Sequence, residues 1–208
     1  MIRKLAVYTL MVLSLAMKVE ASEIPVTQVK DKIVQQSVEM GVDPAIALSL
    51  AKAESGFRHN SKSPYGAVGV FQLMPSTAKK LGVNPYHLDG NIRGGLMYYK
   101  MLYKMFGSNE LALAAYHTGP AYVIKHKKPA PCSRVYISAI MKEYHRIKAH
   151  TDPAILRHND WLKLKQQAAN NVKVAPKDEQ DKSNLIEKAR PKEENEHSAC
   201  KGKIDKSV

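Results

Sequence analysis

Three short stretches of the sequence contain residue types that acid–base chemistry uses. ESGF places Glu54 at the end of an apolar helical pattern, and SPYGAVGVFQ, residues 63–72, follows it with glycines that interrupt an apolar run. LALAAYHTGP places Tyr116 and His117 at the end of another apolar pattern. Each stretch alone is common, since Glu54 could be a solvated helix-end acid and Tyr116 a core residue. Their order and spacing along the chain are the specific feature.

A carboxylic acid can donate a proton and later accept one if it stays partly protonated near neutral pH. Such an acid needs surroundings poor in solvent and free of cations, because burial disfavours its charged form. Glycosidases generally add a second carboxylate, but none of the other acids between residues 22 and 150 lies in the Gly-rich stretch. Glu54 is therefore expected to act alone, which suits a mechanism assisted by the substrate itself.

The ordered blocks resemble those of the lytic transglycosylases whose catalytic domain is similar to goose lysozyme. The residues that carry the resemblance are ESGF at 54–57, SPYGAVGVFQ at 63–72, LMPSTA at 73–78, NIRGG at 91–95 and LALAAYHTGP at 111–120. The resemblance covers roughly residues 30–146. It implies a mainly α, lysozyme-like helical domain with a short extended or β loop region beside the catalytic groove.

The resemblance also implies a role for individual residues. Glu54 would be the catalytic acid and base, and Tyr116 would hold and tune the Glu54 carboxyl through its hydroxyl. Ser63 and Gln72 would line the groove and hydrogen-bond the sugar or its acetamido group. Phe71 would stand against a sugar face.

The sequence departs from the family pattern at two of these positions. GVFQ places Phe71 where the family usually has methionine, an apolar exchange that adds no polar group. AYH places His117 where the family usually has asparagine in the groove, and histidine titrates near neutrality. The role of His117 in substrate binding is thereby left open, with a second catalytic base as the alternative. Asn91 opens NIRGG and is expected to be structural rather than catalytic.

The implied reaction cleaves the β-1,4 bond between N-acetylmuramic acid and N-acetylglucosamine in peptidoglycan. Glu54 would protonate the glycosidic oxygen and, once ionised, take the proton of the muramoyl 6-hydroxyl, which closes a 1,6-anhydro ring. No water is consumed, and no cofactor or metal is expected. A hydrolytic lysozyme on the same scaffold and a non-catalytic wall-binding assembly factor are the alternatives.

Helical periodicity defines the elements that must position these residues. Asp43 is a natural N-cap, and Pro44 suits the first position of the helix that runs to Glu54. Residues 56–72 lack helical period and could contain a short extended ribbon. Helices are expected over residues 27–41, 43–55, 75–82, 91–107, 109–119 and 133–148.

The first 21 residues have the three parts of a secretory signal. MIRK is a basic start, LAVYTLMVLSLAM is a short apolar stretch, and Val19 and Ala21 suit the −3 and −1 positions of a cleavage site. We therefore expect a signal peptide at residues 1–21 and an exported, periplasmic protein. An uncleaved membrane anchor is the alternative.

Positive charge is concentrated in the predicted domain, residues 22–150. It contains 17 Lys and Arg against 8 Asp and Glu, whereas residues 151–208 contain 12 against 10, in a chain of net charge +13. A basic surface suits an anionic polymer. That polymer could be nucleic acid, a lipid surface or the acid-bearing peptides of a bacterial cell wall; export argues against nucleic acid, and charge alone names no partner. The glycan strands of peptidoglycan are the partner that the resemblance implies.

Residues 151–208 form a polar tail for which disorder is the default expectation, although PAILRHNDWLKLKQQ could add a helix. Cys132 and the tail residue Cys200 could pair, bridge to another chain or remain as thiols. One catalytic domain with a short tail is similar to the small specialised transglycosylases of conjugation, secretion and pilus systems. That resemblance implies envelope components as partners of the tail.

Overall fold

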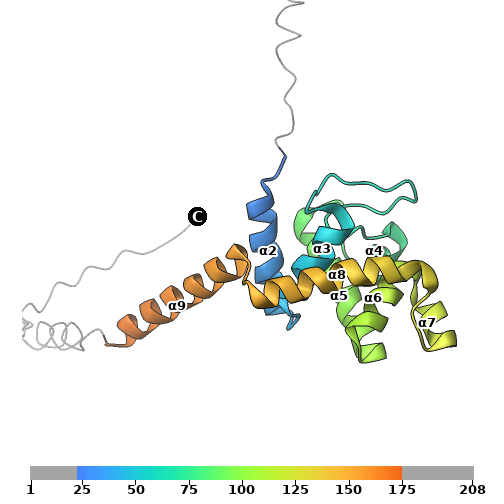
Figure 1. Ribbon diagram of the computed structural model, residues 1–208. Helices are drawn as coiled ribbons and strands as arrows, with labels where there is room; N and C mark the ends of the chain where they lie inside the picture. The colour runs from blue at the N-terminus through green and yellow to red at the C-terminus, as the bar shows by residue number, and fades with distance from the viewer. Residues whose placement is uncertain (1–22, 175–208) are drawn as a thin grey trace, which may run out of the picture. The chain divides into compact units, whose positions relative to one another are not determined.

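The computed structural model describes residues 23–174, and the described part of the chain is mainly α-helical (Figure 1). The elements are α2 (Val26–Glu39), α3 (Pro44–Ser55), α4 (Pro75–Leu81), α5 (Leu88–Phe106), α6 (Asn109–Thr118), α7 (Pro120–His126), the 3₁₀ turn η1 (Pro131–Ser133), α8 (Arg134–Ala149) and α9 (Pro153–Val174). Extended pairing in these residues is limited to two isolated bridges, Lys62 with Val68 and Val68 with Leu73. The expected fold class is confirmed. The predicted signal peptide and Cys200 lie outside the described residues.

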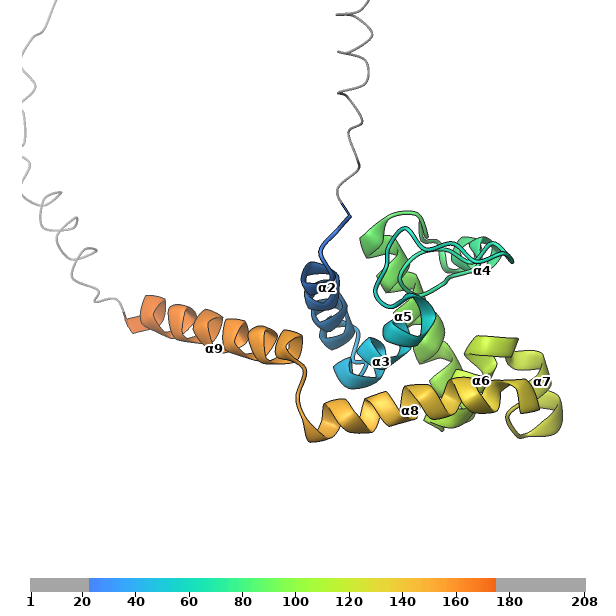
Figure 2. The same cartoon turned by 45° about the horizontal axis from the view of Figure 1, so that its top comes forward.

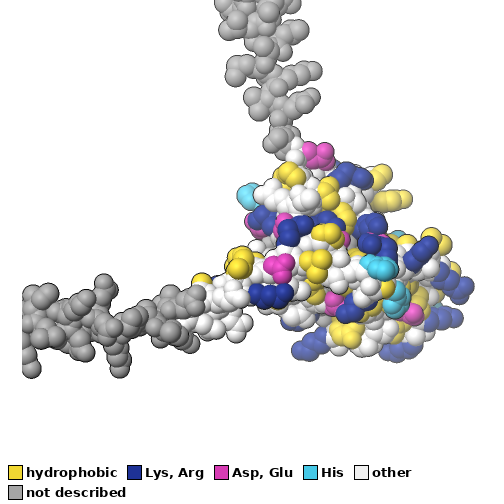
Figure 3. All heavy atoms as spheres, turned by 60° about the vertical axis from the view of Figure 1, so that its left-hand side comes forward, with side chains coloured by type: hydrophobic (Ala, Val, Ile, Leu, Met, Phe, Trp, Pro, Cys, Tyr) yellow, Lys and Arg dark blue, Asp and Glu magenta, His cyan; other side chains and the backbone are white. Residues whose placement is uncertain are grey.

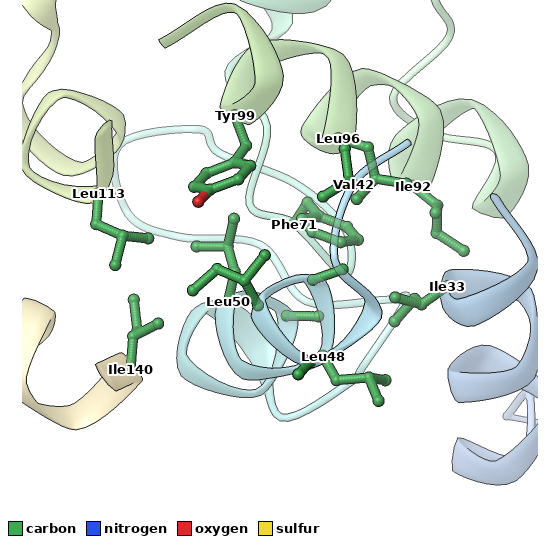
Figure 4. Packing of buried hydrophobic residues seen from close by; sticks show 14 of the residues in the cluster. Ile33, Val42, Leu48, Leu50, Phe71, Ile92, Leu96, Tyr99, Leu113 and Ile140 are labelled. Atoms are coloured by element: carbon green, nitrogen blue, oxygen red, sulfur yellow. The ribbon is translucent and has the colours of Figure 1, made fainter. Parts of the chain in front are cut away.

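Helix α3 runs through the centre of the hydrophobic core. It packs against α2 and α8, while α5 packs against α6 and α2. Seven consecutive residues of α3, Ala45–Ala51, are buried, so the helix is enclosed on all sides. Figure 4 shows Phe71 between Leu50 of α3 and Leu96 of α5, while Leu48 lies on the side of α3 that faces away from Phe71. Because α3 is packed on all sides, the position of a side chain at its end is fixed relative to the core.

Both ends of α3 are set by local chemistry. The Asp43 carboxylate accepts a hydrogen bond of 2.8 Å from the Ala45 backbone N–H, which confirms the predicted N-cap. At the other end, Gly56 (φ 61°) and Phe57 (φ 69°) both have left-handed backbone conformations. Glycine adopts this conformation readily, whereas a bulky residue such as phenylalanine rarely does. The chain therefore turns sharply away directly after Ser55.

The segment between α3 and α4 forms the extended loop, residues 56–74, which lies beside the N-terminal part of α5 (Figure 2). The buried Asn91 side chain of α5 donates to the backbone carbonyls of Val68 (2.8 Å) and Pro85 (2.9 Å). Its oxygen accepts the Phe71 backbone N–H at 2.9 Å. These contacts confirm that Asn91 is structural through packing, but α5 begins at Leu88, so the prediction that Asn91 opens the helix is wrong.

Two glycines let the extended loop approach α5 this closely. A Cβ atom on Gly69 would overlap the Asn91 amide, and one on Gly95 would overlap the Phe71 side chain. Gly69 also has a φ of 77°, which favours glycine over other residues. The loop sequence SPYGAVGVFQ and the α5 sequence NIRGG therefore pack directly against each other.

The structure differs from the sequence predictions toward the C-terminus. No helix was predicted where α7 lies. Residues 153–174 are helical, so the alternative of a helix in PAILRHNDWLKLKQQ is confirmed over the default expectation of disorder. Asp152 caps α9 by accepting the Ala154 N–H at 3.0 Å, and it also forms an ion pair with Lys30. Ala154 is 1% exposed, so this helix begins inside the packed domain. Of the described residues, 23–163 belong to one compact unit and 164–174 to another.

Surface features of the described residues complete the description. Lys and Arg side chains are spread over the face shown in Figure 3, with smaller acidic areas between them. Cys132 is exposed. Within residues 23–174, no helix has both the length and the apolar character needed to cross a bilayer.

We predict that Asn91→Ala strongly destabilises the fold. The substitution leaves three backbone groups without their partner, and each buried unsatisfied group costs about 1–3 kcal/mol. The free energy of unfolding, measured by chemical denaturation, should fall by about 3 kcal/mol or more. Asn60→Ala, at an exposed position of the same loop, should stay within about 0.5 kcal/mol of the parent. Equal unfolding free energies for the two variants would contradict the role given to Asn91.

Candidate active site

Glu54 and Ser55, at the end of α3, point their side chains to different partners. The buried Ser55 hydroxyl donates to the Val70 carbonyl at 2.8 Å and so ties the end of α3 to the extended loop. Glu54 is only partly buried, and its carboxylate accepts a hydrogen bond from the Tyr136 hydroxyl of α8. The pair thus joins α3 to two elements at once.

The prediction that the Tyr116 hydroxyl holds the Glu54 carboxyl is wrong, because the hydroxyl that holds this carboxyl belongs to Tyr136. Tyr116 donates to the backbone carbonyl of Phe71 at 2.9 Å, and its ring lies 5.1 Å from that of Tyr98. Its helix therefore presents the hydroxyl to the extended loop. The contact of Tyr136 with Glu54 joins residues 82 positions apart.

A sequence signal for Tyr136 exists in the pattern of α8. Tyr136 stands four residues before the buried Ile140 and eleven before the buried Ile147, so it shares the core-facing side of the helix. A polar aromatic residue on such a face needs a partner for its hydroxyl. The pattern could have identified the residue, but it could not have identified Glu54 as the partner.

Burial raises the pKa of Glu54 from 4.5 to about 7, and the hydrogen bond from Tyr136 partly opposes that rise. No other charged group of the described residues is among the causes of this shift. Burial, together with the charge of Glu54, raises the pKa values of Tyr116 and Tyr136 well above 10. Both hydroxyls therefore remain neutral donors, while Glu54 exchanges its proton near neutral pH.

His117 contacts the residue that holds Glu54. Its ring is stacked on that of Tyr136, with centroids 4.5 Å apart and an angle of 16° between the planes. Its Nδ1 lies 3.2 Å from the hydroxyl oxygen of the buried Ser133. The side chain itself is exposed. His117 thus belongs to the same cluster as the Glu54 carboxylate. It contacts Tyr136, and Tyr136 in turn contacts the carboxylate.

The remaining predicted site residues lie in or beside the extended loop. Phe71 is 0% exposed, so the prediction that its ring meets a sugar is wrong in this structure: the ring fills the core against Gly95. Ser63 is partly exposed and accepts the Ala67 N–H at 3.0 Å. Gln72 is partly exposed, with a φ of 44°, and donates to the Gly69 carbonyl at 2.9 Å. Both polar side chains thus stabilise the loop itself.

Comparison with known proteins gives a family match over just under half of the chain. Residues 31–133 match the family model described as the transglycosylase SLT domain. The chain is 31% identical over 120 residues to the transglycosylase of Enterobacteria phage PRD1, covering 57% of this chain and 44% of that protein. It is 35% identical over 94 residues to the soluble lytic murein transglycosylase of Salmonella typhimurium, covering 39% of this chain and 15% of that protein. The chain spans less than half the length of these relatives.

The solved structures to which this chain is similar are also lytic transglycosylases. An inactive mutant of the lytic transglycosylase Slt from Pseudomonas aeruginosa has a TM-score of 0.50 and 25% identity, covering 59% of this chain and 25% of that one. The 70 kDa soluble lytic transglycosylase of Escherichia coli has a TM-score of 0.50 and 24% identity, covering 60% of this chain and 25% of that one. The second likeness concerns the fold alone.

We predict that Glu54→Gln changes how stability depends on pH. The folded-state pKa of Glu54 lies above its unfolded value, so the stability that protonation gives is complete below pH 4.5 and is lost as the pH rises through about 7. A shift of this size is equivalent to about 3 kcal/mol. The variant should therefore gain up to about 3 kcal/mol over the parent between pH 5 and pH 8.

Denaturation curves of parent and variant at the two pH values check this directly. Glu143→Gln is the matched control, because ion pairs with Arg146 and Lys52 lower the pKa of Glu143 to about 2. That variant should lose stability relative to the parent, and by the same amount at pH 5 and pH 8. A parent-to-Glu54→Gln difference that does not change with pH would contradict the raised pKa.

Proposed function

The chain carries a transglycosylase SLT domain over residues 31–133, and on this premise we propose that it is a peptidoglycan lytic transglycosylase. It cleaves the β-1,4 bond between N-acetylmuramic acid and N-acetylglucosamine and leaves a 1,6-anhydromuramoyl end. The observation that carries the proposal is the Glu54 carboxyl: partly buried, with a pKa of about 7, and held by one tyrosine hydroxyl. An acid of this kind can both give and take a proton at neutral pH.

In the first step the protonated Glu54 donates its proton to the glycosidic oxygen as the bond to the muramoyl anomeric carbon breaks. The carbon acquires oxocarbenium character, which a second carboxylate stabilises in most glycosidases. No other carboxylate of the described residues perturbs the Glu54 pKa. The N-acetyl carbonyl of the substrate takes that role, as in substrate-assisted glycosidases.

In the second step the ionised Glu54 removes the proton of the muramoyl 6-hydroxyl, whose oxygen then attacks the anomeric carbon. The proton count closes, because Glu54 regains the proton that it gave. Tyr136 donates to the carboxylate and stabilises its charged form, so it favours loss of the proton in the first step and keeps Glu54 ionised until the second. Tyr136 is thus a positioning residue for the catalytic Glu54.

The neighbouring residues act by holding this arrangement. Tyr116 fixes the Phe71 carbonyl and so the backbone that leads to Gln72. Ser63 and Gln72, both partly exposed, remain the proposed contacts of the sugar or its acetamido group. His117, stacked on Tyr136, limits the motion of the tyrosine ring and presents its exposed edge to substrate.

The cellular role we propose is local opening of the wall in the periplasm during assembly of a secretion, conjugation or pilus apparatus. The signal features of residues 1–21 support export, and the small catalytic domain followed by a polar segment supports a specialised role. Envelope components of the apparatus would bind the segment after residue 150. The domain arrangement proposed is signal peptide, catalytic domain over residues 22–150, and C-terminal segment.

The reaction is tested by the masses of fragments released from purified peptidoglycan. We predict anhydro products, each one water lighter than the reducing-end products of a hydrolytic lysozyme. Glu54→Gln should lower the rate at least about 100-fold, because it removes the only proton donor of the first step. Glu143→Gln should retain activity. Reducing-end products would assign a lysozyme, and unchanged release by Glu54→Gln would refute the catalytic assignment.

We also predict that Tyr136→Phe moves the pH profile of the reaction. The first step needs protonated Glu54, so the rate of the parent falls as the pH rises through about 7. The Tyr136 hydrogen bond lowers the pKa of Glu54; without it the pKa rises, and the alkaline limb of the profile shifts to higher pH. Tyr116→Phe removes a hydroxyl that bonds the backbone instead and should leave the limb in place. Coincident limbs for the parent and Tyr136→Phe would contradict the role of Tyr136.

A further inference from the structure

A hollow of about 540 Å³ lies beside α8, away from the residues of the candidate active site. Its lining residues are Glu110, Lys128, Pro129, Arg134, Ile137, Ser138, Met141 and Lys142. We call it the basic hollow. Neither Glu54 nor any tyrosine that surrounds it is part of this lining, so the basic hollow is a separate feature of the surface.

Three cations of the basic hollow lack a counter-ion within the described part of the chain. Lys128, Arg134 and Lys142 are exposed, and none of them forms an ion pair there. Other cations of the domain do, among them Lys30 with Asp152 and Lys52 with Glu143. The lining contains one acid, Glu110, against the three cations. The hollow is therefore a site of net positive potential.

The rest of the lining limits the kind of anion that fits. Ile137 is 8% exposed and Met141 is partly buried, so they form an apolar floor beneath the charged rim. Ser138 adds a hydroxyl that can donate or accept. A volume in the range of ligand pockets, with a cationic rim and an apolar floor, suits a short peptide that carries carboxylates and small apolar side chains.

We propose that the basic hollow binds the carboxylates of the stem peptides that the wall polymer carries on its muramic acid residues. This inference rests on the proposed function and adds to it a preference for stem-bearing glycan. A nucleic acid or an anionic bilayer fits less well, because an extended backbone or a flat surface would not use the apolar floor.

The stem is long enough to connect the two places. Arg134 and Ile137 flank Tyr136 on α8, and an α-helix with its side chains is about 10–12 Å across. A stem of about four residues, fully extended, spans about 13 Å. Tyr136 and the lining residue Ile137 are consecutive on α8 and point about 100° apart, so the stem passes about a third of the way around the helix and not across it. A sugar bound at Glu54 can therefore place the carboxylates of its own stem in the basic hollow.

The double variant Arg134→Glu/Lys142→Glu tests the proposal in the full chain. Its kcat/KM on stem-bearing peptidoglycan should fall about tenfold, as expected for rim charges that steer and hold an anion. On glycan strands stripped of stems by an amidase it should change less than about twofold. Stripped strands keep the lactyl carboxylate of muramic acid. The comparison of the two substrates therefore distinguishes recognition of the stem carboxylates from recognition of any negative charge on the glycan. Lys79→Glu/Lys80→Glu, on exposed positions of α4, makes the same change of charge and should affect the two substrates equally.

A binding measurement keeps the test independent of catalysis. A synthetic stem tetrapeptide with free carboxylates should bind the parent, bind at least fivefold more weakly to the double variant, and lose affinity when its carboxylates are amidated. Lys128→Glu, on the segment before α8, should weaken binding in the same direction. Equal loss on stemmed and stripped substrates, or unchanged peptide affinity, would overturn the proposal. Failure of the proposed function would appear differently, as no cleavage of stripped strands by the parent.

Discussion

The buried amide of Asn91 is the contact on which the arrangement of the site depends. It holds three backbone groups, two in the extended loop and one just before α5, with donors and acceptors matched. The loop so fixed presents the Val70 carbonyl to Ser55 and the Phe71 carbonyl to Tyr116. A loop without regular strands would otherwise have few ways to satisfy its buried backbone. One side chain of α5 therefore sets the positions of α3 and α6 relative to the loop.

The same packing produces the chemistry proposed for Glu54. Burial that raises the pKa of an acid makes the folded state less stable at neutral pH than a neutral residue would. This unfavourable group stands near the end of α3, a helix buried in the core, and a tyrosine of α8 holds its carboxyl. Tyr136 recovers part of the cost by stabilising the ionised form, and that form is the base of the second step. Ionisation of Glu54 thus lowers the stability of the folded protein, and the same ionised form supplies the base of the proposed second step.

Local sequence signals predicted the fold well. Periodicity located most helices, and Asp43 with Pro44 marked the start of α3, as Asp152 with Pro153 marks α9. A helix from Pro153 was predicted only as an alternative to disorder, because the few apolar residues after it gave a weak pattern. Phe71 and Tyr116 were assigned contacts that depend on which way a side chain points across the fold. Spacing alone does not contain that direction, so Phe71 proved to be core and Tyr136 took the place expected for Tyr116.

Two sides of helix α8 have different roles, and helical geometry determines which residues lie on each side. Tyr136, Ile140 and Ile147 share the side that faces α3 and the core, where burial and a hydrogen bond control Glu54. Arg134, Ile137 and Met141 recur at helical spacing along another side, where the cations face solvent. Ile137 and Ile140, three residues apart, point about 60° apart and belong to the same hydrophobic cluster, so the two sides adjoin. Arg134 and Tyr136, two residues apart, point about 160° apart, so the cation and the tyrosine face different surroundings. A substrate that uses both must have a rigid sugar for one and a long, charged branch for the other, and a glycan that carries peptides has this form.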